Sequence, residues 1–175
     1  MTLDDLGPRI IIMGPSNSGK STLAQSIARA RGLPAVHLDR LHHLPDTDWV
    51  PRPAAAFAAL HDGAIRCDRW VIDGNYTRLL PARLDRATGL ILLDLSTPHS
   101  LWRYLRRCWF ERDRAGGLAG GRDSVKAAML RHIAITTRAN RRRYARMADT
   151  LALPVIRLDT PACVDAFYRA NGLHR

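Results

Sequence analysis

Lysine is almost absent from this chain of 175 residues. Only Lys20 and Lys126 occur, although lysine and arginine together number 27, against 16 acidic residues. No apolar run approaches the roughly 18 residues that a membrane-spanning helix needs, so no membrane partner is expected. Because lysine is so rare here, Lys20, which stands inside a glycine-containing stretch, is a candidate functional residue.

Cysteine is scarce as well. Cys67, Cys108 and Cys163 lie far apart and form no CxxC pair, which predicts reduced, mostly buried thiols rather than disulfides or a metal site. The first residues, MTLDDLGPR, are acidic and lack the positively charged start of a signal peptide. We therefore expect a cytoplasmic protein, and the sequence leaves its oligomeric state open.

Segments with the features of strands alternate with segments with those of helices. Strands are predicted at 10–12, 35–38, 70–72, 90–93 and 155–158, and helices at 20–31, 51–67, 98–112, 123–148 and 161–170. The β-branched run at 10–12 is typical of a strand buried on both faces of a parallel sheet. The alternation predicts one α/β domain over residues 1–175, with a three-layer architecture and a parallel sheet.

The stretch GPSNSGKS follows the first predicted strand and has the spacing G-x-x-x-x-G-K-S of a phosphate-binding loop. Its glycines let backbone N–H groups approach an anion, and the following helix adds positive charge at its N-terminus. This predicts binding of ATP and Mg²⁺, with Lys20 on the β- and γ-phosphates and the Ser21 hydroxyl on Mg²⁺. The predicted nucleotide-binding residues are Gly14, Pro15, Ser16, Asn17, Ser18, Gly19, Lys20, Ser21 and Thr22.

Three aspartates follow or end predicted strands, namely Asp39, Asp73 and Asp94. They are expected at the carboxyl edge of the sheet, where open α/β proteins bind ligands. Asp73 in WVIDGNY fits best as the acid that completes the metal site with Ser21. Each aspartate could instead cap a helix or a turn, and whether Asp39 or Asp94 joins Asp73 at the metal is left open.

Several segments resemble P-loop small-molecule kinases of the adenylate kinase type. ILLDLSTPHSLWRYLRR, residues 91–107, is similar to the stretch that leads from the fourth strand into the lid of these enzymes, and its R-x-x-x-R falls on Arg103 and Arg107. The resemblance implies a sheet order of 2-3-1-4-5 and a basic helical lid at about 98–148. It also implies that Arg103 and Arg107 act with Lys20 and Asp73 in catalysis.

The resemblance is closer still to bacterial DNA topology modulation and adenylate-kinase-related proteins. Their GPSGSGKSTLA, HLDxL, W-x-P and IDGNY segments match residues 14–24, 37–41, 49–51 and 72–76, so the similarity spans nearly the whole chain. It implies transfer of the ATP γ-phosphate to a nucleoside monophosphate or a similar small metabolite. The arginine that adenylate kinases place four residues after the third-strand aspartate is Thr77 here. The predicted acceptor residues are Asp39, Trp49, Asn75, Tyr76 and Arg78.

The positive charge is concentrated between residues 100 and 146, which hold twelve Arg and one Lys against three acidic residues. This segment could be a lid hinged at the glycines of 116–121, a nucleic-acid surface, or a solvated helix face. As a lid it would turn Arg103 and Arg107 to the triphosphate and leave residues 141–143 in water. The alternative function is a nucleic-acid-binding P-loop ATPase that modulates DNA topology. Trp102 and Trp109 are predicted to face the core, and Trp49 either stacks on an acceptor base or covers the core edge.

Overall fold

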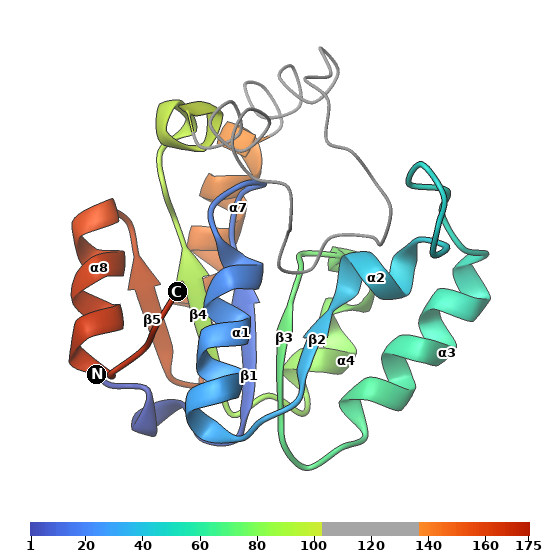
Figure 1. Cartoon of the computed structure of the whole chain (residues 1–175), viewed down its shortest axis with the longest axis horizontal. Coiled ribbons are helices and arrows are strands. Elements are labelled where there is room, and N and C mark those ends of the chain that lie inside the picture. Colours follow the sequence, from blue (N-terminus) through green and yellow to red (C-terminus); the bar gives the residue numbers. More distant parts are fainter. Residues whose placement is uncertain (103–136) are drawn as a thin grey trace.

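A five-stranded parallel sheet forms the centre of the molecule. A computed structural model describes residues 1–102 and 137–175. The strands are β1 (Arg9–Met13), β2 (Ala35–His37), β3 (Trp70–Asp73), β4 (Gly89–Leu93) and β5 (Val155–Leu158). They lie side by side in the order β2-β3-β1-β4-β5, as Figure 1 shows from β5 on the left to β2 on the right. All four pairs are parallel, which confirms the expected topology.

Helices connect the strands. The predicted helices at 20–31 and 51–67 appear as α1 (Lys20–Arg31) and α3 (Ala54–Ile65), and α8 (Pro161–Ala170) follows β5. A further helix begins at residue 97 and runs to the end of the described range at 102. The predicted helix at 123–148 is described only in its last part, where α7 (Thr137–Asp149) lies. Arg103, Arg107, Cys108, Trp109 and the glycines of 116–121 fall outside the described residues.

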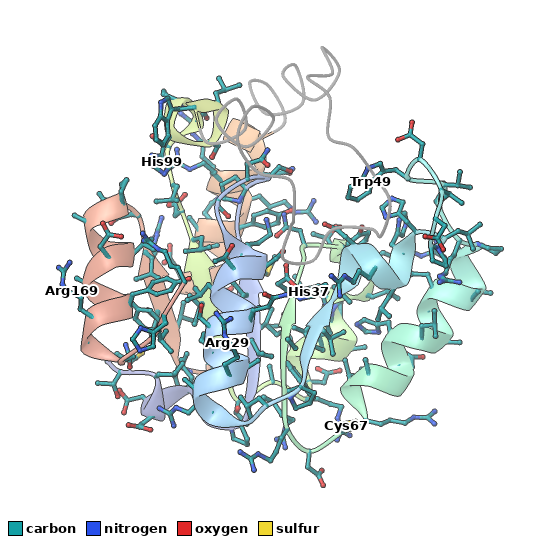
Figure 2. The ribbon with its side chains drawn as sticks, in the orientation of Figure 1. Arg29, His37, Trp49, Cys67, His99 and Arg169 are labelled. Carbon is teal, nitrogen blue, oxygen red and sulfur yellow. The ribbon has the colours of Figure 1, made fainter. Side chains whose placement is uncertain are left out.

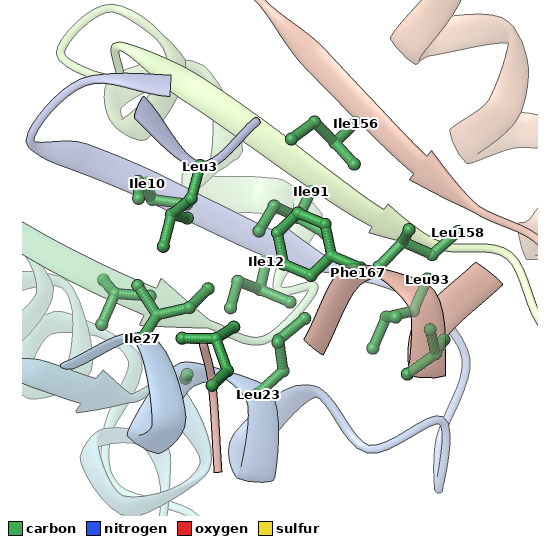
Figure 3. Packing of buried hydrophobic residues seen from close by; sticks show 14 of the residues in the cluster. Leu3, Ile10, Ile12, Leu23, Ile27, Ile91, Leu93, Ile156, Leu158 and Phe167 are labelled. Carbon is green, nitrogen blue, oxygen red and sulfur yellow. The ribbon is translucent and has the colours of Figure 1, made fainter. Parts of the chain in front are cut away.

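Side chains of β1 alternate between two hydrophobic cores, one on each face of the sheet. Ile10 and Ile12 pack with α1, α8 and β5, as the close-up in Figure 3 shows. Ile11 and Met13 face the opposite core, which receives residues of α3 and α7. Since both faces of the central strands are covered, these strands read as continuous apolar runs rather than alternating ones.

Four short helical segments have no clear counterpart in the sequence pattern. They are η1 (Asp4–Leu6), α2 (Leu38–His42), η2 (Thr77–Leu79) and α4 (Leu80–Leu84). Segments of three to five residues complete at most one or two turns, so they cannot show the repeated apolar spacing that identifies a helix. Two of them lie at the carboxyl edge of the sheet, because α2 follows β2 directly and η2 follows β3 after a turn of three residues.

Two expectations about buried side chains were wrong. Cys67 and Cys163 are exposed rather than buried, because one follows the end of α3 and the other lies in the first turn of α8. Trp102 is 57% exposed and therefore does not face the core. Within residues 1–102 and 137–175, no helix has both the length and the apolar character needed to cross a membrane.

Candidate nucleotide-binding site

The phosphate-loop sequence connects the carboxyl end of β1 to the first residue of α1. Gly14 opens the loop at φ +152°, and a Cβ at this position would lie 2.4 Å from the carbonyl oxygen of Leu93 in β4. Asn17 and Gly19 have positive φ angles of 63° and 94°. The loop therefore folds tightly against β4, in a conformation that glycine and asparagine adopt more readily than other residues.

Polar groups of the loop and the adjoining helix fit an anion. Helix α1 begins at Lys20 without a side-chain cap hydrogen bond at its N-terminus, which leaves first-turn N–H groups for a ligand. The hydroxyl of Ser18 is buried and has no partner among the described residues. Lys20 reaches back over the loop, where its Nζ donates to the carbonyl oxygen of Pro15 at 2.7 Å. Together these groups provide the positive potential and the hydrogen-bond donors that a phosphate chain requires.

Ser21 and Asp73 meet beside the loop, as the sequence predicted. β3 pairs with β1 in a register that sets Asp73 opposite Ile12, and the Ser21 hydroxyl donates to Oδ2 of Asp73 at 2.6 Å. Asp73 is 4% exposed, and its other oxygen contacts Nδ1 of His37. A hydroxyl and a carboxylate are the oxygen ligands that Mg²⁺ takes at nucleotide sites, where water and phosphate oxygens complete its coordination. The two side chains therefore fit the predicted cation.

Asp94, which follows β4, is engaged by two arginines. Nε of Arg141 lies 2.7 Å from its Oδ1, and Arg157 contacts Oδ2 at 2.9 Å. Arg141 also donates to the backbone carbonyl oxygen of Asp94 at 2.7 Å, so the ion pairs hold α7 against the end of the sheet. The expectation that Arg141 faces water was wrong, whereas Arg142 and Arg143 are exposed as predicted.

Asp39 and Tyr76 form a second polar pair at this edge of the sheet. Asp39 lies on α2, and the Tyr76 hydroxyl donates to its Oδ1 at 2.7 Å. Burial, followed by the neighbouring charge of Asp39, raises the pKa of the Tyr76 phenol, so the phenol keeps its proton and remains a donor. The Tyr76 ring contacts the rings of His42 and Phe57, with centroids 4.8 and 5.0 Å away. This arrangement places a carboxylate at the edge of an aromatic cluster.

The other predicted acceptor residues have different surroundings. The side-chain amide of Asn75 is bound to the phosphate loop: its Nδ2 donates to the carbonyl oxygen of Gly14 at 2.9 Å, and its Oδ1 accepts from the Gly14 N–H at 3.2 Å. Trp49 packs edge-on against His43, with ring centroids 5.0 Å apart (labelled in Figure 2). Arg78 is exposed in η2. The structure thus brings Asp39 and Tyr76 together and places the amide of Asn75 against the phosphate loop.

Arg83 is a structural element of the site that the sequence did not reveal. It is fully buried on α4, and its guanidinium donates to the carbonyl oxygens of Gly74 at 2.9 Å, Asn75 at 2.8 Å and Tyr76 at 3.2 Å. Burial lowers its pKa to about 10. These bonds hold the turn after β3, in which Tyr76 has the unusual φ of +21°. An arginine within the apolar segment LLPARL was the only signal available in the sequence.

Comparison with known proteins identifies the fold. No protein-family profile matches the chain, and no curated protein sequence does. Solved structures do match. A proposed kinase from Chloroflexus aurantiacus J-10-fl has a TM-score of 0.57 and 18% sequence identity, over 95% of this chain and 97% of that one. The TM-score is also 0.57 for a gluconokinase from Sinorhizobium meliloti 1021 (16% identity, over 95% of this chain and 91% of that one) and is 0.52 for a shikimate kinase from Acinetobacter baumannii (15% identity, over 93% and 90%). The chain therefore has the three-layer P-loop fold. In this P-loop fold the glycine-rich loop, Asp73 and the Asp39–Tyr76 pair share one edge of the sheet.

Proposed function

We propose that the protein is an ATP-dependent phosphotransferase, which moves the γ-phosphate of ATP to a small metabolite in the cytoplasm. The observation that carries this proposal is the contact between Ser21 and Asp73 beside a loop whose Ser18 hydroxyl is buried without a partner among the described residues. The similarity to solved gluconokinase and shikimate kinase structures supports the same class of reaction.

The chain's own residues divide the work between two sides of the site. On the nucleotide side, residues 14–22 bind the phosphates and Lys20 exchanges its contact with Pro15 for the β- and γ-phosphates. Ser21 and Asp73 hold Mg²⁺, which neutralises charge on the phosphates when bound. Arg103 and Arg107, from the proposed lid, complete the catalytic set by stabilising charge on the transferred group.

The acceptor side centres on Asp39 and Tyr76, with Trp49 and Arg78 as further candidates. A nucleoside monophosphate is the acceptor that the resemblance to adenylate kinases favours. The Asp39–Tyr76 hydrogen bond favours a second class, a hydroxylated metabolite, because a carboxylate accepts a hydrogen bond from a hydroxyl but repels a phosphate. We keep both classes as candidates.

A screen of ATP consumption tests the proposal. Purified protein is incubated with ATP, Mg²⁺ and one candidate acceptor at a time: nucleosides, nucleoside monophosphates, or small hydroxylated metabolites. We expect ADP release to depend on one acceptor class, with formation of the phosphorylated acceptor. A parallel arm contains duplex DNA, because the resemblance to DNA topology modulation proteins and the basic segment at 100–146 support a DNA-dependent ATPase as the alternative. Turnover stimulated by DNA alone would contradict the kinase proposal.

A further inference from the structure

The side chains of His37 and Asp73 form a buried pair at the carboxyl edge of the sheet. β2 and β3 run parallel with His37 opposite Asp73 in register. Nδ1 of His37 contacts Oδ1 of Asp73, and each side chain is 5% exposed. Figure 2 shows His37 where β2 leads into α2, beside α1. The pair is set by strand register, and water has little access to it.

The hydrogen bonds around His37 define the position of its proton. An ionised carboxylate can only accept, so the contact with Asp73 requires the proton on Nδ1. On the other side of the ring, Nε2 lies 3.5 Å from the amide nitrogen of Gln25 in α1, which can only donate. The ring therefore donates to Asp73 and accepts from Gln25, and the two partners fix its orientation.

We propose that His37 is a positioning residue for the magnesium site. It holds Oδ1 of Asp73, so that Oδ2 stays on the Ser21 hydroxyl, 2.6 Å away. Because the Ser21 proton then points to Asp73, the lone pairs of its oxygen remain available for Mg²⁺. The inference rests on the proposed function in one respect: it requires that the loop binds a nucleotide with Mg²⁺.

Removing the imidazole leaves a defined defect. Oδ1 of Asp73 would be buried without its donor, and the carboxyl group would be free to turn away from Ser21. Loss of a partner that orients a metal ligand costs about 10- to 100-fold in metal affinity in other proteins. Binding of the nucleotide phosphates to the loop does not involve His37, so affinity for the metal-free nucleotide is expected to persist.

The test measures nucleotide affinity with and without the metal. Calorimetry gives the Kd of the non-hydrolysable analogue AMP-PNP in Mg²⁺ and in EDTA. The readout is the gain from Mg²⁺, which is the Kd in EDTA divided by the Kd in Mg²⁺. In His37→Leu we expect the gain from Mg²⁺ to fall about tenfold, with the Kd in EDTA close to that of the wild type. His37→Asn places an amide nitrogen near the position of Nδ1 and should keep most of the gain. His37→Gln carries its amide farther out, toward Gln25, and should lose it.

A buried histidine elsewhere provides the matched control. His61 on α3 is fully buried and contacts Asp62, so His61→Asn tests the loss of a buried imidazole without touching Asp73. We expect its Mg²⁺ gain to equal that of the wild type. If His37→Leu does not fold, the comparison of His37→Asn with His37→Gln carries the test.

Two results would overturn the inference. One is a gain from Mg²⁺ in both His37→Leu and His37→Gln that equals the gain in the wild type. The other is a loss of this gain in His61→Asn as large as the loss in the His37 variants. A wild-type protein that binds no AMP-PNP would instead refute the proposed function, which is a distinguishable outcome.

Discussion

At the scale of single residues, Arg83 makes the most unusual contacts near the site. A fully buried guanidinium donates to three consecutive backbone carbonyls and holds the turn that carries Asn75 and Tyr76. Replacing it by methionine fills the space but removes the side-chain donor from all three carbonyls, of which, among the described residues, only that of Tyr76 keeps another bond, from the Leu79 N–H at 3.1 Å. Since hydrogen bonds to a charged group contribute about 1.5 to 3 kcal/mol, we expect Arg83→Met to lower the unfolding free energy by about 3 kcal/mol, measured by urea denaturation.

The neighbouring Arg78 is the control for this prediction. It is exposed in η2, and substitutions at exposed positions usually change stability by less than about 0.5 kcal/mol. Arg78→Met should therefore unfold at nearly the same urea concentration as the wild type. Equal stability of the two variants would show that the contacts of Arg83 contribute nothing.

The residue scale also shows what the sequence could predict of the site. Ser21 and Asp73 were predictable because the loop motif fixes one and the end of the neighbouring strand fixes the other. His37 was visible as a residue, but its contact with Asp73 depends on the β2–β3 register, which the sequence alone does not give. Asn75 was predicted on the acceptor side, and IDGNY carries no information on the contact of its amide with Gly14. Such contacts between distant segments appear only when the chain is folded.

At the scale of elements, the phosphate loop depends on its close approach to β4. A Cβ on Gly14 would lie 2.4 Å from the Leu93 carbonyl oxygen. Gly14→Ala is therefore expected to lower the unfolding free energy by about 2 kcal/mol and to weaken ATP binding, as measured by denaturation and calorimetry. The control is Gly63 in α3, where a Cβ meets nothing within 4 Å. Gly63→Ala should be neutral or raise stability by up to about 1 kcal/mol, and a Gly14→Ala variant as stable as this control would contradict the account.

Helix α7 is attached to the sheet through Arg141. This arginine contacts both the carboxylate and the backbone carbonyl of Asp94, whereas Arg142 and Arg143 are exposed. We expect Arg141→Ala to lower the unfolding free energy by about 2 kcal/mol and to speed the exchange of backbone amide hydrogens in α7. The double change Arg142→Ala/Arg143→Ala should leave the unfolding free energy and the exchange rates in α7 unchanged. Faster exchange in the double variant, or none in Arg141→Ala, would be inconsistent with this attachment.

The strands and the helices α1, α3 and α8 were predictable, and the short helical segments were not. The strand 10–12 and helix 20–31 have strong local signals: a β-branched run, and a periodic segment that ends before Gly32 and Pro34. They appear as β1 and α1 within one residue at either end. In contrast, α2 and α4 have five residues each, too few to show a repeated apolar spacing.

At the scale of the whole molecule, arginine variants of the basic segment can distinguish the proposed kinase from the DNA-binding alternative. If 98–148 is a lid, Arg103→Ala or Arg107→Ala should lower turnover by about 10³-fold or more, because each acts on the transferred phosphate. Arg142→Ala/Arg143→Ala should retain activity. If the segment binds nucleic acid, the double variant should weaken DNA retention and flatten its dependence on salt. Turnover and DNA retention measured on the same variants distinguish the two functions, and full activity without Arg103 or Arg107 would refute the lid.

The most direct test of the account is the affinity for ATP when either lysine is removed. Lys20 lies over the phosphate loop, with its Nζ on the Pro15 carbonyl, and Lys126 is the only other lysine in the chain. Calorimetry with ATP and Mg²⁺ compares the wild type, Lys20→Ala and Lys126→Ala. Because Lys20→Ala removes a charged contact to the phosphates, we predict that its affinity falls about tenfold or more, while Lys126→Ala binds like the wild type. Equal ATP binding by all three proteins would contradict the claim that this loop binds the nucleotide.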